Sequence, residues 1–282
     1  MAERELTGMT IVFQAVPLER NLELQAELGF TATEIWKPHL GPRLGPRMLN
    51  AVARYARDIG LRLSALNSIG EPYFDPFAGE AAFAATLDGL KADIEICHHL
   101  GIPTLAVWEG RPQPGRDLEW HLDLQGRLFS AALEYAGTQG LREIVFEPHP
   151  FTVGFVLGGL PELCRAVGTE RFGLILDTCH LSVAFPRDYL SRLADVVPYV
   201  RHVHLADADL QTSELHYPPG QGLLDLEGCV RALREGGYRG SVAWDLFSWP
   251  FPVRAIKETR PAFERLAASL HGDGGHEGSS ST

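Results

Sequence analysis

The sequence predicts a single (β/α)8 barrel, and three observations lead to that prediction. Short apolar runs rich in Val, Ile and Leu alternate eight times with longer segments of helical periodicity. Glycine tends to end a helical segment just before the next apolar run. The length of 282 residues also suits one such barrel, which typically needs about 250 residues. Eight strand-helix units in series close into a parallel barrel with its active site at the carboxyl ends of the strands.

Strands are expected at the short apolar runs, namely within residues 10–13, 32–36, 61–66, 103–108, 143–149, 173–180, 200–207 and 241–246. Helices are expected at the periodic segments, namely 18–28, 47–59, 80–100, 118–140, 160–167, 188–196, 226–235 and 253–270. Residues 1–270 therefore form one barrel domain, and the Gly/Ser/His-rich tail 271–282 is expected to be disordered. A doubly wound sheet is the structural rival, but residues 13–17 are not the glycine-rich turn that such folds place after the first strand.

Composition narrows the classes of partner. The net charge of −11 argues against binding to nucleic acid or to an anionic membrane, since either partner needs a basic surface. A small molecule is the better default. The four cysteines form no Cys-x-x-Cys pair, no basic and apolar leader precedes residue 10, and no apolar run is long enough for a bilayer. These features predict a cytoplasmic protein with reduced thiols, and a homo-oligomer remains open.

Three of the predicted strands end in carboxylates and imidazoles. Glu147, Asp177 and His204 each follow or close a run of Val, Ile and Leu. Because the carboxyl ends of barrel strands meet at one mouth, these side chains are expected to converge. Carboxylate oxygens and imidazole nitrogens together suit a divalent cation of intermediate hardness such as Mn²⁺, Zn²⁺, Co²⁺ or Fe²⁺.

With these marks the chain resembles the xylose isomerase-like barrel superfamily. That group includes sugar isomerases and epimerases, inosose and dehydroshikimate dehydratases, and the endonuclease IV fold. The resemblance rests on a fifth-strand Glu, a sixth-strand Asp-x-x-His, a seventh-strand His-x-x-Asp and an eighth-strand carboxylate. These marks fall on Glu147, on 177–180, on 204–207 and on Asp245. The loop 216–222 also resembles the Pro-Gly-x-Gly turn of the family.

The resemblance implies one divalent metal ion, Mn²⁺ first, with Zn²⁺, Co²⁺, Mg²⁺ or Fe²⁺ as alternatives. The implied ligands are Glu147, Asp177, His204 and Asp245. Asp245 stands where the family has the longer Glu, so either the metal lies nearer the eighth strand or the ligand set is incomplete. Leu210 replaces an arginine of several ketose 3-epimerases, which disfavours a standard free-ketose epimerase. The nuclease is disfavoured because the histidines of its further metal sites are missing after strands two to four.

In the chemistry that the resemblance implies, the metal polarises a keto-polyol and a carboxylate removes the α-proton. Glu147 is the expected base, and Asp245 faces it across the mouth to return the proton in an epimerisation. A lyase is the alternative, in which the same proton abstraction expels a β-substituent. His149 lies two residues beyond Glu147, on the same side of the strand, and either acts as acid or base or caps the turn.

Other polar and aromatic side chains near the strand ends are expected to contact substrate. These candidates are Lys37, Trp108, Glu109, His180 and His216. For Trp108 the alternative is loop packing, and for His180 it is a buried imidazole bonded to the backbone. His202 is expected to pack or to support the site from elsewhere, and Asp207 to hold a neighbouring imidazole or the loop.

The predicted function is a divalent-metal-dependent sugar isomerase or epimerase acting on a sugar or cyclitol-type small molecule. A metal-dependent dehydratase or lyase acting on a keto-cyclitol, dehydroshikimate-like or keto-glycoside compound is the second hypothesis. A protein that keeps the metal but only binds a ligand or partner is the third.

Overall fold

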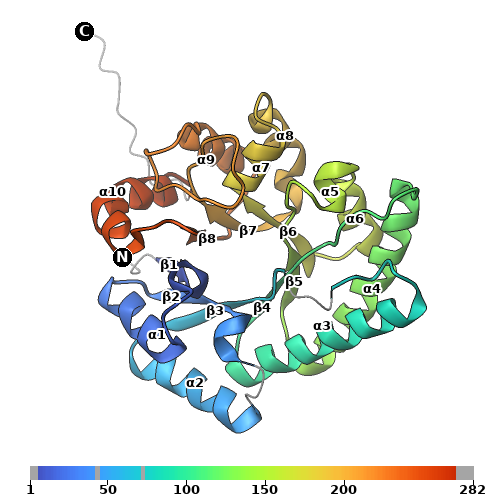
Figure 1. The fold of residues 1–282 in the computed structure, drawn as a ribbon, viewed down its shortest axis with the longest axis horizontal. Helices are drawn as coiled ribbons and strands as arrows, with labels where there is room; N and C mark the ends of the chain where they lie inside the picture. The colour runs from blue at the N-terminus through green and yellow to red at the C-terminus, as the bar shows by residue number, and fades with distance from the viewer. Residues whose placement is uncertain (1–5, 42–44, 71–73, 271–282) are drawn as a thin grey trace.

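Eight parallel strands close into a barrel in chain order, each paired with the next and β8 with β1 (Figure 1). A computed structural model describes residues 6–41, 45–70 and 74–270. The predicted tail 271–282 lies outside the described residues. The strands are β1 (Thr7–Met9), β2 (Ala32–Trp36), β3 (Arg62–Asn67), β4 (Thr104–Val107), β5 (Glu143–Phe146), β6 (Phe172–Asp177), β7 (Val200–Leu205) and β8 (Ser241–Trp244). The predicted fold class is confirmed.

The helices form a ring outside the barrel, as Figure 1 shows. They are α1 (Leu18–Glu27), α2 (Pro46–Asp58), α3 (Glu80–Leu100), α4 (Leu118–Gln139), α5 (Val153–Val156), α6 (Leu160–Val167), α7 (Thr178–Ala184), α8 (Tyr189–Val196), α9 (Leu226–Glu235) and α10 (Pro252–Leu270), with 3-10 turns η1 (Thr10–Phe13), η2 (Lys37–Leu40) and η3 (Val197–Tyr199). Gly101 and Gly140 end α3 and α4 in the left-handed conformation, which only glycine adopts without strain.

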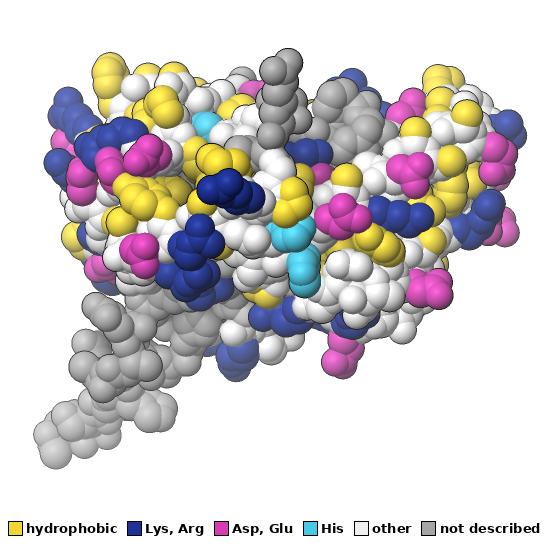
Figure 2. All heavy atoms as spheres, turned by 90° about the horizontal axis from the view of Figure 1, so that it is seen from below, with side chains coloured by type: hydrophobic (Ala, Val, Ile, Leu, Met, Phe, Trp, Pro, Cys, Tyr) yellow, Lys and Arg dark blue, Asp and Glu magenta, His cyan; other side chains and the backbone are white. Residues whose placement is uncertain are grey.

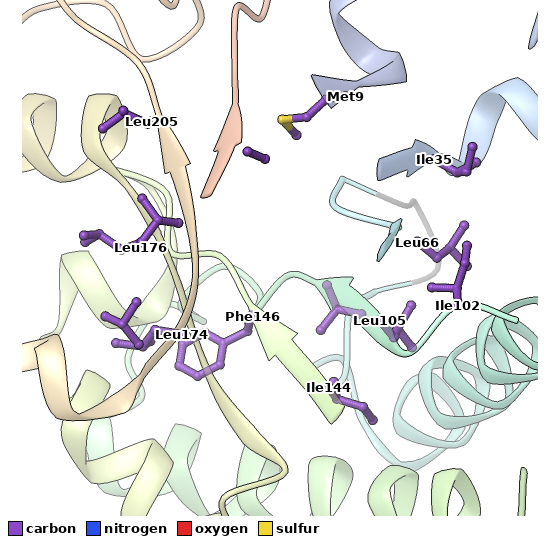
Figure 3. Packing of buried hydrophobic residues seen from close by; sticks show 14 of the residues in the cluster. Met9, Ile35, Leu66, Ile102, Leu105, Ile144, Phe146, Leu174, Leu176 and Leu205 are labelled. Atoms are coloured by element: carbon purple, nitrogen blue, oxygen red, sulfur yellow. The ribbon is translucent and has the colours of Figure 1, made fainter. Parts of the chain in front are cut away.

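Alternate residues of each strand divide between two environments. Ile144, Phe146 and their counterparts on neighbouring strands point outward and fill the layer between barrel and helices, part of which Figure 3 shows. Ala106, Val145 and Ile175 form a separate, small cluster of inward-facing residues. Glu147 and Asp177 follow Val145 and Ile175 by two positions, so strand geometry carries both carboxylates into the barrel mouth.

The first strand lies earlier than predicted. Residues 10–13 were expected to form it, but β1 is Thr7–Met9 and the apolar run after it is the 3-10 turn η1. The Thr10 hydroxyl accepts a hydrogen bond from the Trp36 amide (2.7 Å), so the chain turns where β1 meets the end of β2. An apolar run can line a cavity as well as form a strand, which explains the error.

Acidic and basic side chains alternate over the face shown in Figure 2. Several are paired along helices, such as Arg260 with Glu264. Pairs at this spacing contribute little stability individually. Within the described segments, none of the helices combines the length and apolarity needed to cross a bilayer.

The last helix is fastened to the barrel by aromatic stacking. Phe263 of α10 lies flat against Trp244 of β8, with ring centroids 4.5 Å apart and planes inclined by 6°. Both side chains are 1% exposed. Because β8 must pair with β1 to close the barrel, this contact supports the closure.

We expect Phe263→Ala to lower the free energy of unfolding by about 3–5 kcal/mol, because it leaves a cavity beside Trp244. Urea denaturation followed by circular dichroism measures the change. Phe251→Ala is the matched control: this side chain is 68% exposed, so the cost should stay within about 0.5 kcal/mol. Equal losses in the two variants would contradict the assigned packing.

Candidate functional site

A cavity of about 270 Å³ opens at the carboxyl ends of the strands. Its lining combines apolar side chains with carboxylates and imidazoles: Met9, Ile11, Trp36, Asn67, Ile69, Gly70, Trp108, Glu147, His149, His180, His204, Glu214, His216, Asp245 and Phe247. No lysine or arginine occurs among these described lining residues. The cavity therefore gathers negative charge without a basic side chain to balance it.

His204 lies at the centre of the polar cluster. Its Nδ1 is 2.6 Å from Glu147 Oε1 and 4.0 Å from Asp245 Oδ2. Donor atoms of Glu147, Asp177 and His204 all lie within 4.8 Å of one another, and all three residues are buried. The structure thus brings together the three strand-end residues that the sequence analysis grouped, with Asp245 beside them.

Asp177 ends β6 and also starts α7, where its Oδ1 accepts a hydrogen bond from the His180 amide (2.8 Å). This is an N-cap, which satisfies one of the free amides at the start of a helix. The other oxygen, Oδ2, is buried and accepts no hydrogen bond from the described residues. One oxygen therefore positions the carboxylate and leaves the second available to the cavity.

Asp245 is oriented by two contacts. Its Oδ1 accepts a hydrogen bond from the Phe247 amide (2.8 Å), and its Oδ2 lies 3.1 Å from His216 Nδ1. The same nitrogen of His216 is 3.8 Å from Asp177 Oδ2. His216 is 1% exposed, so the imidazole lies between two carboxylates rather than on the surface of the loop.

The crowding of acids changes the protonation of the whole group. Burial, the main cause, and the nearby Glu147 and Asp245 raise the pKa of Asp177 to about 6, against the pull of His216. Although burial acts to lower it, ion pairing with Glu34 and Glu147 raises the pKa of His204 well above its usual range. The histidines thus carry the positive charge that no lysine or arginine supplies.

His149 and His180 form the second wall of the polar cluster. His149 Nε2 is 3.0 Å from Glu147 Oε2, and the His149 and His180 rings have centroids 3.9 Å apart. Burial, together with the neighbouring His149, lowers the pKa of His180 well below its usual range, so its ring is neutral. Nδ1 of each ring is buried without a hydrogen bond from the described residues. Trp108 lies against His149, with centroids 5.4 Å apart.

Two of the predicted substrate contacts are not brought to the cavity lining. Lys37 forms an ion pair with the buried Asp93 (2.7 Å). Glu109 is 1% exposed, and its Oε1 accepts a hydrogen bond from the Thr152 hydroxyl (2.6 Å) at the start of α5. Both side chains follow a strand, as predicted, but each turns toward a helix. A position next to a strand end does not decide which way the side chain points.

Sequence reasoning missed Glu34 and misjudged His202. His202 and His204 are two residues apart on β7 and both point inward, where their Nε2 atoms contact the two oxygens of Glu34. Although burial acts to raise it, pairing with His204 and His202 lowers the pKa of Glu34 to about 2. The signal in the sequence was a lone carboxylate within the apolar strand β2. The alternation of side chains on β7 was the signal for His202.

Asp207 holds the loop that covers the mouth, which was one of its two expected roles. Its carboxylate accepts hydrogen bonds from the amides of Gly220 (2.9 Å), Gly222 (3.0 Å) and Leu224 (3.0 Å). A Cβ at Gly222 would lie 2.3 Å from Asp207 Oδ1, so only glycine allows this approach. The loop carrying His216 is thereby fixed to the end of β7.

A divalent cation fits this donor set. The buried carboxylates lack a lysine or arginine counter-charge, Asp177 Oδ2 lacks a hydrogen bond, and the oxygen and nitrogen donors suit a metal of intermediate hardness. A larger hollow of about 610 Å³ lies by α9 and α10, and its lining includes Arg231, Arg234 and Arg265. It contains none of the residue groups able to hold a metal.

Comparison with known proteins agrees with this architecture. The sequence model of the xylose isomerase-like TIM barrel matches residues 22–266. The chain is 27% identical over 285 residues to fructoselysine 3-epimerase of Shigella flexneri, which covers 95% of this chain and 99% of that protein. It is 24% identical over 221 residues to inosose dehydratase of Geobacillus thermodenitrificans (strain NG80-2), which covers 66% of this chain and 73% of that protein. Both relatives are enzymes.

Among solved structures, that of the IolI protein with a bound zinc atom has a TM-score of 0.78 and 19% sequence identity. The match covers 95% of this chain and 99% of that chain. At this identity the likeness establishes the shared fold.

Glu109 generates a prediction about pH. Burial raises the pKa of Glu109 from its ordinary value of 4.5 to about 7, against the hydrogen bond from Thr152. The folded protein therefore keeps a proton that the unfolded chain releases above pH 4.5, so stability is lost as pH rises toward 7. In Glu109→Gln this loss should shrink by up to about 3 kcal/mol. Urea denaturation at pH 5 and pH 8 measures it, and an identical decline in wild type and variant would contradict the assignment.

Proposed function

This chain belongs to the xylose isomerase-like TIM barrel family, and on that premise we propose that it is a divalent-metal-dependent epimerase or isomerase. It would act by removing an α-proton from a keto-polyol or sugar derivative. One observation supports this most strongly: carboxylates from β5, β6 and β8 surround the His204 imidazole in a buried cavity whose described lining has no basic side chain.

The proposed ligands are Glu147, Asp177, His204 and Asp245. Mn²⁺ is the first candidate, and the zinc held by the structurally similar IolI protein keeps Zn²⁺ in view. Bound there, such a cation supplies Lewis acidity, which makes a proton beside a carbonyl group removable near neutral pH. The shorter Asp245 is held toward the cluster by the Phe247 amide and His216, which favours its inclusion in the ligand set.

Glu147 is the proposed base. Burial acts to raise its pKa, but pairing with His204 and hydrogen bonds from His149 and His204 lower the pKa well below the usual range. The carboxylate is thus ionised and ready to accept a proton. Asp245, on β8, lies on the other side of His204 from β5 in the closed order of strands and can return a proton to the opposite face.

His180, His216 and Trp108 are the proposed substrate contacts. The neutral His180 ring offers Nδ1 to a hydroxyl group, and Trp108 provides a flat apolar wall together with Trp36 and Phe247. Such a wall suits a sugar or cyclitol ring, whose CH faces stack on aromatic side chains. The absence of lysine and arginine from the described lining favours a substrate without a phosphate group.

A dehydratase is the second candidate, supported by His149. Its Nε2 contacts the proposed base, and its buried Nδ1 has no hydrogen bond from the described residues. An imidazole placed there can protonate a departing hydroxyl group after Glu147 has removed the α-proton. Similarity to an inosose dehydratase supports the same reading.

The epimerase reaction is tested by exchange of the α-proton with deuterium oxide, followed by nuclear magnetic resonance. The panel contains a free ketohexose, fructoselysine and an inosose. We expect exchange with at least one compound, and Glu147→Gln should slow it about 100-fold or more, because the amide cannot take the proton. Glu143→Gln, at the amino end of the same strand, is the matched control and should keep the wild-type rate.

Unchanged exchange in Glu147→Gln would refute the proposed base. Loss of water from the product, abolished in His149→Gln, would favour the dehydratase. A wild-type protein that binds metal but exchanges no proton on the whole panel would favour a non-catalytic binding protein.

Metal binding is tested separately by thermal and urea denaturation of protein dialysed against EDTA. Adding Mn²⁺ at about 100 times its Kd should raise the free energy of unfolding by about 2.7 kcal/mol, since only the folded state holds the cluster. Asp245→Asn should weaken Mn²⁺ binding about 10-fold or more if Asp245 is a ligand. Stability that is indifferent to Mn²⁺ and to the other candidate metals would overturn the proposed centre.

A further inference from the structure

Glu34 is a buried carboxylate that the proposed reaction leaves without a role. It lies on β2, inside the barrel, and is 0% exposed. Glu34 does not line the cavity, so it does not touch a substrate there. An ionised carboxylate in such a place is costly unless both oxygens are paired. The pairing therefore shows what the residue does.

Both partners of Glu34 come from β7, on the other side of the barrel. Its Oε1 contacts His202 Nε2, and its Oε2 lies 3.2 Å from His204 Nε2. A carboxylate only accepts hydrogen bonds, so Nε2 of His204 must carry the proton. In the neutral ring the lone pair is then on Nδ1, the atom that faces Glu147 and Asp245. Glu34 thus selects the tautomer whose free nitrogen points to the proposed metal centre.

His202 extends the chain of hydrogen bonds to a third strand. Its Nδ1 lies 2.7 Å from the Ser241 hydroxyl, and His202 and Ser241 are register partners in the pairing of β7 with β8. The side chains of Glu34, His202 and Ser241 thus connect β2, β7 and β8. Because all three stand on barrel strands, the oxygen that faces His204 has little freedom to move.

We propose that Glu34 is a positioning residue for the metal centre: it fixes the ring and tautomer of His204, while His202 and Ser241 fix Glu34. The inference rests on the proposed function, which makes His204 a ligand. Supports of this kind around ligating imidazoles typically change metal affinity 10–100-fold when removed.

The same residues have a competing reading. Donor atoms of Glu34, His202 and His204 lie within 4.8 Å of one another, so this triad could hold an ion of its own. The contacts favour the hydrogen-bonded arrangement, because each Nε2 already faces its own oxygen of Glu34. The stoichiometry of bound metal distinguishes the two readings.

The test measures Mn²⁺ affinity and stoichiometry by equilibrium dialysis of EDTA-treated protein, with the visible spectrum of the Co²⁺-loaded protein as a second readout. Wild type should bind one ion. Glu34→Gln should bind it 10–100-fold more weakly and show altered Co²⁺ bands, since the amide can present its N–H to His204 and disturb the tautomer. Ser241→Ala, a milder change, should weaken binding at least threefold and serves if Glu34→Gln does not fold.

Glu143→Gln is the matched control. It makes the same chemical change on a barrel strand, where Glu143 Oε1 accepts a hydrogen bond from Thr104 (2.7 Å), far along β5 from the cluster. Its Mn²⁺ affinity should equal that of wild type even if its stability falls, which a purely structural role of Glu34 would also predict for Glu34→Gln.

Wild-type affinity in Glu34→Gln, or in Ser241→Ala where only that variant folds, would overturn the inference and leave the proposed function standing. Two ions in wild type and one in Glu34→Gln would overturn it in favour of a second metal. Weakened binding together with no α-proton exchange in wild type would uphold the positioning role while the proposed reaction failed. A wild type that binds none of the candidate metals would remove both proposals.

Discussion

The concentration of buried carboxylates around one imidazole is the constraint on which the rest of this structure depends. Glu147 and Glu34 lie 2.6 Å and 3.2 Å from the two nitrogens of His204, and Asp245 lies 4.0 Å from it. Like charges at such distances repel strongly in a medium that excludes water. The structure answers with protonated imidazoles and with hydrogen bonds that fix each acid. A divalent cation would relieve the same repulsion more completely, and this links the electrostatics to the proposed chemistry.

The barrel makes that concentration affordable. Outward-facing side chains such as Phe146 and Trp244 are fully covered by the helices, so stability comes from a layer that the site does not use. The inward positions are then free to carry polar groups at the carboxyl ends of the strands. The loop after β7 is held by Asp207 and by the close approach of Gly222. It brings His216 back over the mouth, between Asp177 and Asp245.

Epimerisation, isomerisation and dehydration share their first step, the removal of a proton next to a carbonyl group. The arrangement around Glu147 serves that step in each case, and the later fate of the substrate depends on the neighbouring side chains. Asp245 supports return of a proton to the opposite face, whereas His149 supports expulsion of a hydroxyl group. The relatives divide along the same line, with a sugar-derivative epimerase on one side and a cyclitol dehydratase on the other.

Local pattern was sufficient for the eight strand-helix units and for the convergence of Glu147, Asp177 and His204, because hydrophobic period and side-chain alternation are properties of neighbouring residues. Tertiary structure decided what depends on contacts between distant segments. Glu34 meets His202 across 168 residues of sequence, and Glu109 turns to Thr152 under α5 and away from the cavity. Side-chain direction at a strand end follows from which partner is nearest after the barrel closes, and no local period records that choice.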